Sequence, residues 1–116
     1  MPQRAKDSVT DRVFGALANP TRRDVLDLLL RGPRTVADIA ARFDMARPSV
    51  SEHLKVLRDC GLVEERRDGR FRYYGVDAGP LHELQEWLSP YERFWRDRLT
   101  AMGSVLDEIA ENEDDT

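Results

Sequence analysis

The chain has 116 residues, of which 41% are hydrophobic and 34% are charged, a composition typical of a globular domain and not of a disordered protein. It has no run of about 18 apolar residues and no apolar N-terminal stretch, which argues against a membrane span and a secretory signal. One cysteine excludes an internal disulfide and a multi-thiolate metal site, and we expect a cytoplasmic protein.

The net charge of −4 is unevenly distributed along the chain. Residues 1–41 hold seven Lys/Arg and five Asp/Glu, and residues 42–72 hold eight and six. Residues 77–116 hold three and eleven, so the acidity is concentrated in the C-terminal third. Because the charge at the contact surface, and not the total, governs phosphate binding, the acidic total does not exclude a nucleic-acid partner.

The first part of the chain predicts two short amphipathic helices. Residues 1–8 are polar, and we expect a flexible N-terminus. Apolar side chains recur every four residues from Val9 to Leu17, which predicts a helix. Asn19 can cap a second helix, and Pro20 suits its first position. The buried face of this second helix should consist of Val25, Leu26, Leu29 and Leu30.

The next segment predicts two helices joined by a tight turn. Thr35 and Asp38 resemble a capping box at the start of a third, short helix. Residues 44–46 form the expected turn. A fourth helix should begin near Arg47 and end at Gly61, which suits a left-handed stop. Its inward face should consist of Val50, Leu54 and Leu57.

Residues 62–74 predict a β-hairpin directly after the fourth helix. Asp68-Gly69 is a strong signal for a two-residue turn, and the following residues alternate with period two. We expect Tyr74 and Val76 to touch the core. A helix with a polar leading edge followed by a basic hairpin is the layout of a winged helix-turn-helix. The predicted fold class is therefore mostly α with a small β-hairpin.

The C-terminal third predicts two further helices. Gly79-Pro80 should open a short one, and Ser89 to Glu92 looks like a capping box with proline at the first position of the next. We expect residues 79–110 to form C-terminal dimerisation helices and residues 111–116 to form a disordered acidic tail. The last helix has a nearly continuous coiled-coil seam, formed by Tyr91, Trp95, Leu99, Met102, Leu106 and Ile109.

This seam predicts a homodimer. A winged helix-turn-helix domain needs only residues 9–78, so the seam would remain in water without a partner, and such patches favour aggregation. The alternative is that the last helix folds back on its own domain. If a two-fold partner covers the seam, the first helix can join the interface. The expected interface residues are Val13, Leu17, Trp95, Leu99, Met102, Leu106 and Ile109.

The helix and hairpin together predict double-stranded DNA as the partner. Arg47, at the start of the fourth helix, suits a bidentate contact to guanine in the major groove. The arginines of the hairpin suit phosphates, which add affinity with little sequence choice. The predicted DNA-binding residues are Arg47, Ser49, Ser51, Glu52, His53, Lys55, Arg67, Arg70 and Arg72.

Structural roles remain open for the same side chains. The two serines can satisfy the helix start, and His53 can be an internal hydrogen-bonding residue. Glu52 can pair with Arg47 or Lys55 on the same helix. The hairpin arginines alternate with aromatic residues, so they can also form the solvated face of an edge strand.

Other polar residues do not indicate a metal site or a catalytic site. We expect Arg22 or Arg23 to form a structural ion pair with a carboxylate. Cys60 fits a small packing residue, and His53 and His82 lack the spacing of metal ligands. Neither a nucleophile elbow nor a phosphate-binding loop occurs, so we expect no enzyme, no cofactor and no bound metal. The aromatic residues of 87–95 can line an apolar pocket between the last helices, although core packing is favoured.

Three segments, residues 17–26, 48–57 and 61–70, resemble the ArsR-type (arsenical-resistance repressor-like) winged-helix family of bacterial regulators. Residues 91–99 resemble a subgroup of the family that is not noted for metal sensing. The resemblance implies a homodimeric repressor whose fourth helix enters the major groove. Some metal sensors of the family carry Cys-x-Cys on the third helix or histidines on the last helix, and this chain has neither.

The sequence therefore predicts a dimeric, sequence-specific DNA-binding transcriptional regulator, a repressor that binds a palindromic operator. One alternative is a winged-helix protein–protein module that uses its acidic C-terminal third. Another is a repressor that responds to a metal or to thiol oxidation. The sequence identifies neither the operator, nor the regulated genes, nor any small-molecule effector.

Overall fold

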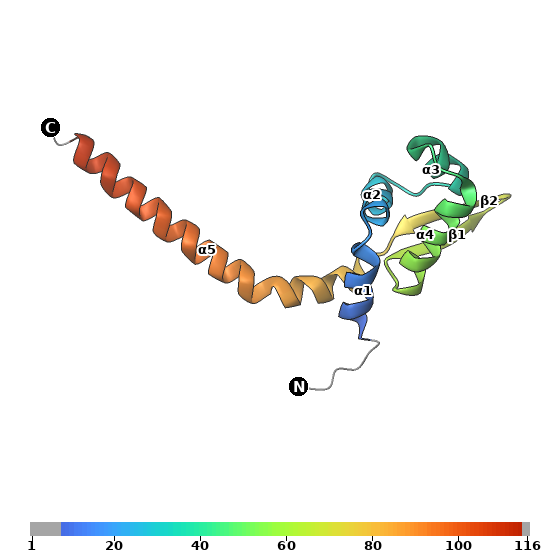
Figure 1. The fold of residues 1–116 in the computed structure, drawn as a ribbon, viewed down its shortest axis with the longest axis horizontal. Coiled ribbons are helices and arrows are strands. Elements are labelled where there is room, and N and C mark those ends of the chain that lie inside the picture. Colours follow the sequence, from blue (N-terminus) through green and yellow to red (C-terminus); the bar gives the residue numbers. More distant parts are fainter. Residues whose placement is uncertain (1–7, 115–116) are drawn as a thin grey trace. The chain divides into compact units, whose positions relative to one another are not determined.

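The computed structural model describes residues 8–114 and forms two compact units, one ending at Leu84 and one beginning at Gln85. The described part contains five helices and one antiparallel hairpin, in agreement with the predicted fold class (Figure 1). The expected flexible N-terminus lies outside the described residues, except for Ser8. The elements are α1 (Val9–Leu17), α2 (Pro20–Leu29), α3 (Val36–Phe43), α4 (Arg47–Asp59), β1 (Val63–Asp68), β2 (Phe71–Val76) and α5 (Gly79–Asp114).

Side-chain caps fix the starts of the first three helices. Ser8, Asn19 and Thr35 each accept a hydrogen bond from the backbone N–H three residues ahead, at 3.1–3.2 Å. Pro20 occupies the first position of α2, as its fixed φ favours. Asp38 does not return the bond that would complete a capping box, because its carboxylate binds two arginines instead. The predicted helix starts are confirmed, but the reciprocal cap at α3 is not.

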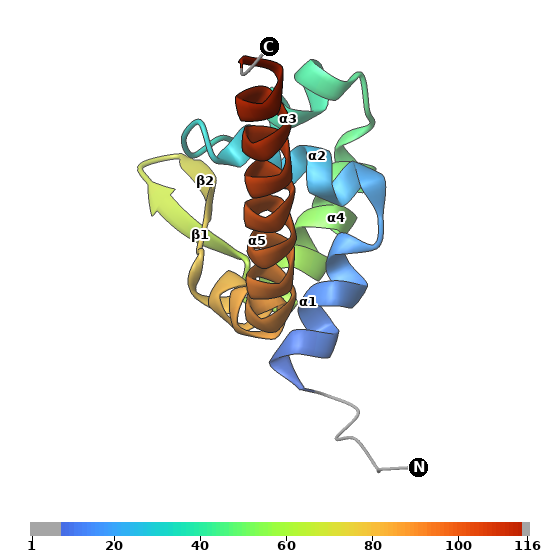
Figure 2. The same ribbon diagram turned by 90° about the vertical axis from the view of Figure 1, so that its left-hand side faces the viewer.

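One hydrophobic core joins α1–α4 to the hairpin. Val25, Ile39 and Leu57 are fully buried and come from three different helices. In both ribbon views the turn of the hairpin lies away from α1 (Figures 1 and 2). Leu30 was expected in this core but is 69% exposed, because α2 ends at Leu29 and Leu30 is its C-cap. The core residues are Val13, Ala16, Val25, Leu26, Leu28, Leu29, Ile39, Ala40, Val50, Leu54, Leu57, Leu62, Val63 and Tyr74.

Two arginines at the start of α2 stabilise the end of α1. The Arg22 Nε donates to the carbonyl of Ala16 at 2.6 Å, and the Arg23 Nη1 donates to the carbonyl of Leu17 at 2.6 Å. These carbonyls have no partner within their own helix, and cations are favoured at a helix C-terminus. The expected pairing of one arginine with a carboxylate is therefore wrong within the described chain, where both bind backbone oxygens.

The hairpin is antiparallel, and Asp68 pairs with Phe71 across its turn. The two turn residues are therefore Gly69, with φ of 62°, and Arg70, one position later than the Asp68-Gly69 turn that we expected. Tyr74 is buried and Val76 packs against the core, both as predicted. A feature not predicted is the backbone pairing of Arg34 with Tyr74, which links the segment before α3 to β2.

The C-terminal third forms one helix, α5, and not the two helices expected from the signal at Ser89. Pro90 lies inside it, although proline cannot donate to the carbonyl of residue 86 and costs about 3 kcal/mol in a helix interior. The helix also continues to Asp114, past the expected end at residue 110, and residues 115–116 lie outside the described part. Leu81 and Leu84 pack against the core and belong to the first compact unit, which extends to Leu84.

Candidate nucleic-acid interface

A left-handed turn sets the geometry of the α3–α4 pair. Asp44 has φ of 52° and donates its N–H to the carbonyl of Ala40. Met45 donates to the same carbonyl at 3.0 Å, so the chain leaves α3 abruptly. The next helix begins at Arg47, and no side chain accepts a capping hydrogen bond from the backbone N–H groups of its first turn. Two helices joined by three residues in this way form a helix-turn-helix.

The predicted recognition side chains lie on the exposed face of α4. Val50, Leu54 and Leu57 are at most 1% exposed and hold the opposite face in the core. His53 is half-buried at the edge between the two faces. Within residues 8–114, the Glu52 carboxylate pairs with neither Arg47 nor Lys55, so the predicted alternative is not realised. The exposed members of the predicted set on α4 are Arg47, Ser49, Ser51, Glu52 and Lys55.

The strand register sorts the arginines of the hairpin onto different surfaces. Arg67 lies opposite Arg72, on the same side of the sheet as the buried Tyr74. Arg66 lies on the other side, where its Nη2 is 3.6 Å from the carboxylate of Glu64. Arg70 lies in the turn. Of the three predicted arginines, Arg67 and Arg72 therefore share one side of the sheet and Arg70 lies in the turn, and all three are exposed.

One carboxylate on β1 binds two arginines that the sequence did not connect. Glu65 Oε2 is 3.1 Å from the Nη1 of Arg58, in the last turn of α4. Its Oε1 is 3.4 Å from the Nε of Arg72 on β2. Arg72, predicted to contact DNA, is thus part of an ion-pair network, and sequence reasoning missed both Arg58 and Glu65. The contacts join residues from three elements, so no local spacing reveals them.

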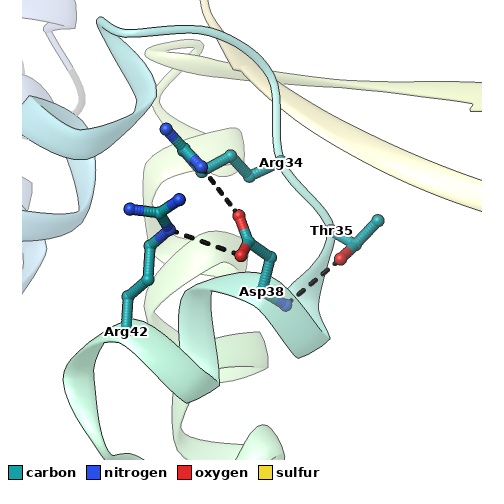
Figure 3. A network of polar contacts seen from close by, with 4 residues as sticks. All are labelled: Arg34, Thr35, Asp38 and Arg42. Atoms are coloured by element: carbon teal, nitrogen blue, oxygen red, sulfur yellow. Dashed lines mark hydrogen bonds and ion pairs between the residues drawn. The ribbon is translucent and has the colours of Figure 1, made fainter.

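A second network fixes the start of α3 (Figure 3). The Arg34 Nη1 is 2.9 Å from Asp38 Oδ2, and the Arg42 Nε is 3.3 Å from Asp38 Oδ1. The hydrogen bond from Arg34 is the main cause that lowers the pKa of Asp38, and Arg42 adds to it. Sequence reasoning missed this network, although the i, i+4 spacing of the three residues is a signal for it. Because Arg34 also pairs with Tyr74, the network connects α3 to the hairpin.

The predicted interface residues of the C-terminal unit form an exposed apolar stripe along α5. At 100° per residue they share one side of the helix. Trp87 and Phe94 are also exposed, and one helix spans this segment. Within residues 8–114 these aromatic residues therefore neither pack into a core nor line the expected pocket between two helices. The exposed fractions are 64% for Trp95, 49% for Leu99, 60% for Met102, 59% for Leu106 and 49% for Ile109.

The two interface residues expected on α1 are less exposed than the residues of the α5 stripe. Val13 is fully buried in the core of its own unit, so it has no surface to offer to a partner. Leu17 is half-buried and packs against the same core. The exposed apolar residues of α1 are Val9 and Phe14, at 47% and 42%.

Candidate metal ligands do not cluster in the described part of the chain. Within residues 8–114 no group of three His, Cys, Asp or Glu side chains is placed to hold a metal ion. The thiol of Cys60 is 3.3 Å from the carbonyl of Leu57, half-buried at the end of α4. No helix in the described range is long and apolar enough to cross a membrane.

Comparison with known proteins identifies the family. Residues 19–65 match the family described as bacterial regulatory protein, arsR family. The chain is 38% identical over 78 residues to the transcriptional repressor SdpR of Bacillus subtilis, covering 67% of this chain and 87% of SdpR. It is 39% identical over 97 residues to the HTH-type transcriptional regulator Rv2034 of Mycobacterium tuberculosis, covering 84% and 88%.

Solved structures agree with this assignment. The crystal structure of an ArsR family transcriptional regulator superposes with a TM-score of 0.68 at 38% identity, covering 77% of this chain and 98% of that one. A solution structure from Mycobacterium bovis, described as a homodimeric winged helix-turn-helix DNA-binding domain, gives a TM-score of 0.61 at 32% identity, covering 80% and 91%. These relatives are regulators and not enzymes. The chain belongs to the ArsR family of winged helix-turn-helix transcriptional regulators.

Proposed function

We propose that this regulator is a homodimeric repressor that binds a palindromic operator in double-stranded DNA. The observation that carries the proposal is the exposed polar face of α4 beside the hairpin arginines, while Val50, Leu54 and Leu57 hold the opposite face of α4 in the core. Repression is supported by the similarity to SdpR, which is a transcriptional repressor. The protein acts in the cytoplasm, where the chromosome lies. We propose no small-molecule effector.

In the proposed complex, α4 enters the major groove and its exposed side chains read base edges. Arg47 makes a bidentate contact to guanine, worth about 1–3 kcal/mol of discrimination against another base. Glu52 accepts from a cytosine amino group, since a carboxylate is repelled by phosphate. Ser49, Ser51 and Lys55 contact bases or phosphates nearby.

The hairpin acts as the wing, which grips the phosphate backbone. Within residues 8–114, the side chains of Arg67 and Arg70 form no ion pair or hydrogen bond, so their charges are available to phosphates. Arg72 is left out of the contact set because Glu65 binds it. His53 is left out because it is half-buried.

The α5 stripe forms the dimer interface in this proposal. Ten large apolar side chains of α5, from Trp87 to Ile109, are exposed, and leaving such a surface in water favours association. The M. bovis neighbour is described as homodimeric, which supports a dimer here. Two-fold symmetry places the two half-sites about 10–10.5 base pairs apart, or a multiple of that distance. In this arrangement residues 9–78 carry DNA binding, with Leu81 and Leu84 packed against their core, and the rest of residues 79–110 carries dimerisation.

A salt titration of DNA binding tests the proposal. The probe is a labelled duplex spanning the DNA upstream of the gene, followed by fluorescence anisotropy. Affinity should fall steeply with salt, with a slope in log K of about −0.9 per phosphate contacted. Changing Arg67 and Arg70 to Ala should flatten this slope, and changing Arg66, on the other side of the hairpin, should not. Equal slopes for the two variants would exclude the wing assignment, and no binding at low salt would exclude the function.

A further inference from the structure

Glu65 occupies an unusual place in the hairpin. It lies on β1 opposite Tyr74, on the side of the sheet that meets the core. Its side chain is 23% exposed, whereas the arginines that it binds are 45% and 57% exposed. The other glutamate of β1, Glu64, is 56% exposed and is 3.6 Å from its partner Arg66. Glu65 is therefore the more sheltered carboxylate of the strand.

The two carboxylate oxygens of Glu65 contact arginines on two different elements. One is 3.1 Å from Arg58 on α4, and the other is 3.4 Å from Arg72 on β2. An isolated ion pair at a surface contributes little, but a network that shares one partly sheltered carboxylate is more effective. The contact joins the last turn of α4 to the wing.

The strand register shows why a carboxylate is needed at this position. Arg67 and Arg72 are directly opposite each other across the two strands, and like charges in this position destabilise a hairpin. Glu65 precedes Arg67 by two residues, so it lies on the same side of the sheet and diagonal to Arg72. Its negative charge compensates this repulsion, because its Oε1 is 3.4 Å from the Nε of Arg72.

We propose that Glu65 is a positioning residue that sets the cationic charge of the wing, by binding Arg72 and Arg58 so that only Arg67 and Arg70 are available to DNA phosphates. This inference rests on the proposed function. The three-residue network of Arg58, Glu65 and Arg72 carries one net positive charge instead of two. A phosphate that approached Arg72 would also approach the carboxylate, which repels it.

The test compares salt slopes of DNA binding for the full-length protein and four variants, on the upstream duplex. Arg70→Ala should reduce the slope by about 0.9 per subunit, because one phosphate contact is lost. Arg72→Ala should leave the slope unchanged. Glu65→Gln should steepen the slope by about 0.9 for each freed arginine that reaches a phosphate. Glu64→Gln is the matched control, because it removes the same charge from the same strand but leaves Arg72 bound.

Two results would overturn the inference. One is a loss of slope in Arg72→Ala equal to that in Arg70→Ala, which would mean that Arg72 contacts phosphate directly. The other is a slope in Glu65→Gln no steeper than in Glu64→Gln. Because Glu65→Gln can destabilise the protein, circular dichroism checks the fold of this variant. The comparison of Arg72→Ala with Arg70→Ala does not depend on the Glu65 variant.

A measurement without DNA separates this inference from the proposed function. The ¹⁵N heteronuclear NOE of Arg72 Nε should exceed that of Arg70 Nε in the free protein and should fall in Glu65→Gln. Equal values for both arginines would show that Glu65 does not hold Arg72, and would end the inference. If the wild-type protein bound no duplex, the proposed function would fail, while the NOE would still decide whether Glu65 positions Arg72.

Discussion

Shortening Leu99 on α5 should weaken the homodimer without unfolding the subunit. The Leu99 side chain is 49% exposed, so about half of its surface remains for a partner to cover. Full burial of a leucine is worth about 1.5–3 kcal/mol, so the remaining half is worth about 0.8–1.5 kcal/mol. Two-fold symmetry doubles this to about 1.5–3 kcal/mol per dimer, which raises the dissociation constant about 10- to 150-fold in Leu99→Ala.

Sedimentation equilibrium measures this dissociation constant directly. Thr100→Ala is the matched control, because Thr100 is exposed on the side of α5 away from the stripe. Its dissociation constant should stay close to that of the wild type. Circular dichroism should give the same helix content for both variants. If Leu99→Ala dimerised as tightly as Thr100→Ala, the stripe would not be the interface.

Three further predictions concern the site and the core. Changing Arg47 to Ala should relax base preference at one position per half-site, and an unaltered preference in a randomised-site selection would remove Arg47 from the recognition set. The lowered pKa of Asp38 means that its charged form stabilises the fold above a pH of about 4 and that this contribution is lost as pH falls through the folded-state pKa. Urea unfolding across this range should therefore show less acid destabilisation in Asp38→Asn than in the wild type, and parallel curves would contradict the ion-pair network. Leu54→Ala should cost about 2–5 kcal/mol of unfolding free energy, because Leu54 is 1% exposed. In the same assay Leu30→Ala should cost less than about 0.5 kcal/mol, because Leu30 is 69% exposed. Similar losses for the two variants would contradict the assigned core boundary.

The sequence predicted the helix-turn-helix well because its signals are local. Asn19 and Thr35 cap the helices that begin at the next residue, by accepting from the N–H three residues ahead. Gly61 and Gly69 take positive φ where the chain turns. The apolar spacing of α4 also predicted its buried face. Such features depend on neighbours within one turn of helix or one hairpin, so a single sequence contains them.

The errors arose where distant contacts or competing local signals decide the structure. The capping signal at Ser89 predicted a new helix, but α5 continues through Pro90. Arg22 satisfies carbonyls at the end of the preceding helix, a role that no spacing rule distinguishes from an ion pair. The contacts of Glu65 depend on strand register and on the approach of α4, which only the folded chain defines.

A hydroxyl-radical footprint on the upstream duplex shows whether paired subunits bind a two-fold-symmetric site, since it reports where they protect the DNA backbone. We expect two protected patches related by two-fold symmetry, with centres about 10–10.5 base pairs apart or a multiple of that distance. A single unpaired patch, or no protection at low salt by a folded protein, would contradict this expectation.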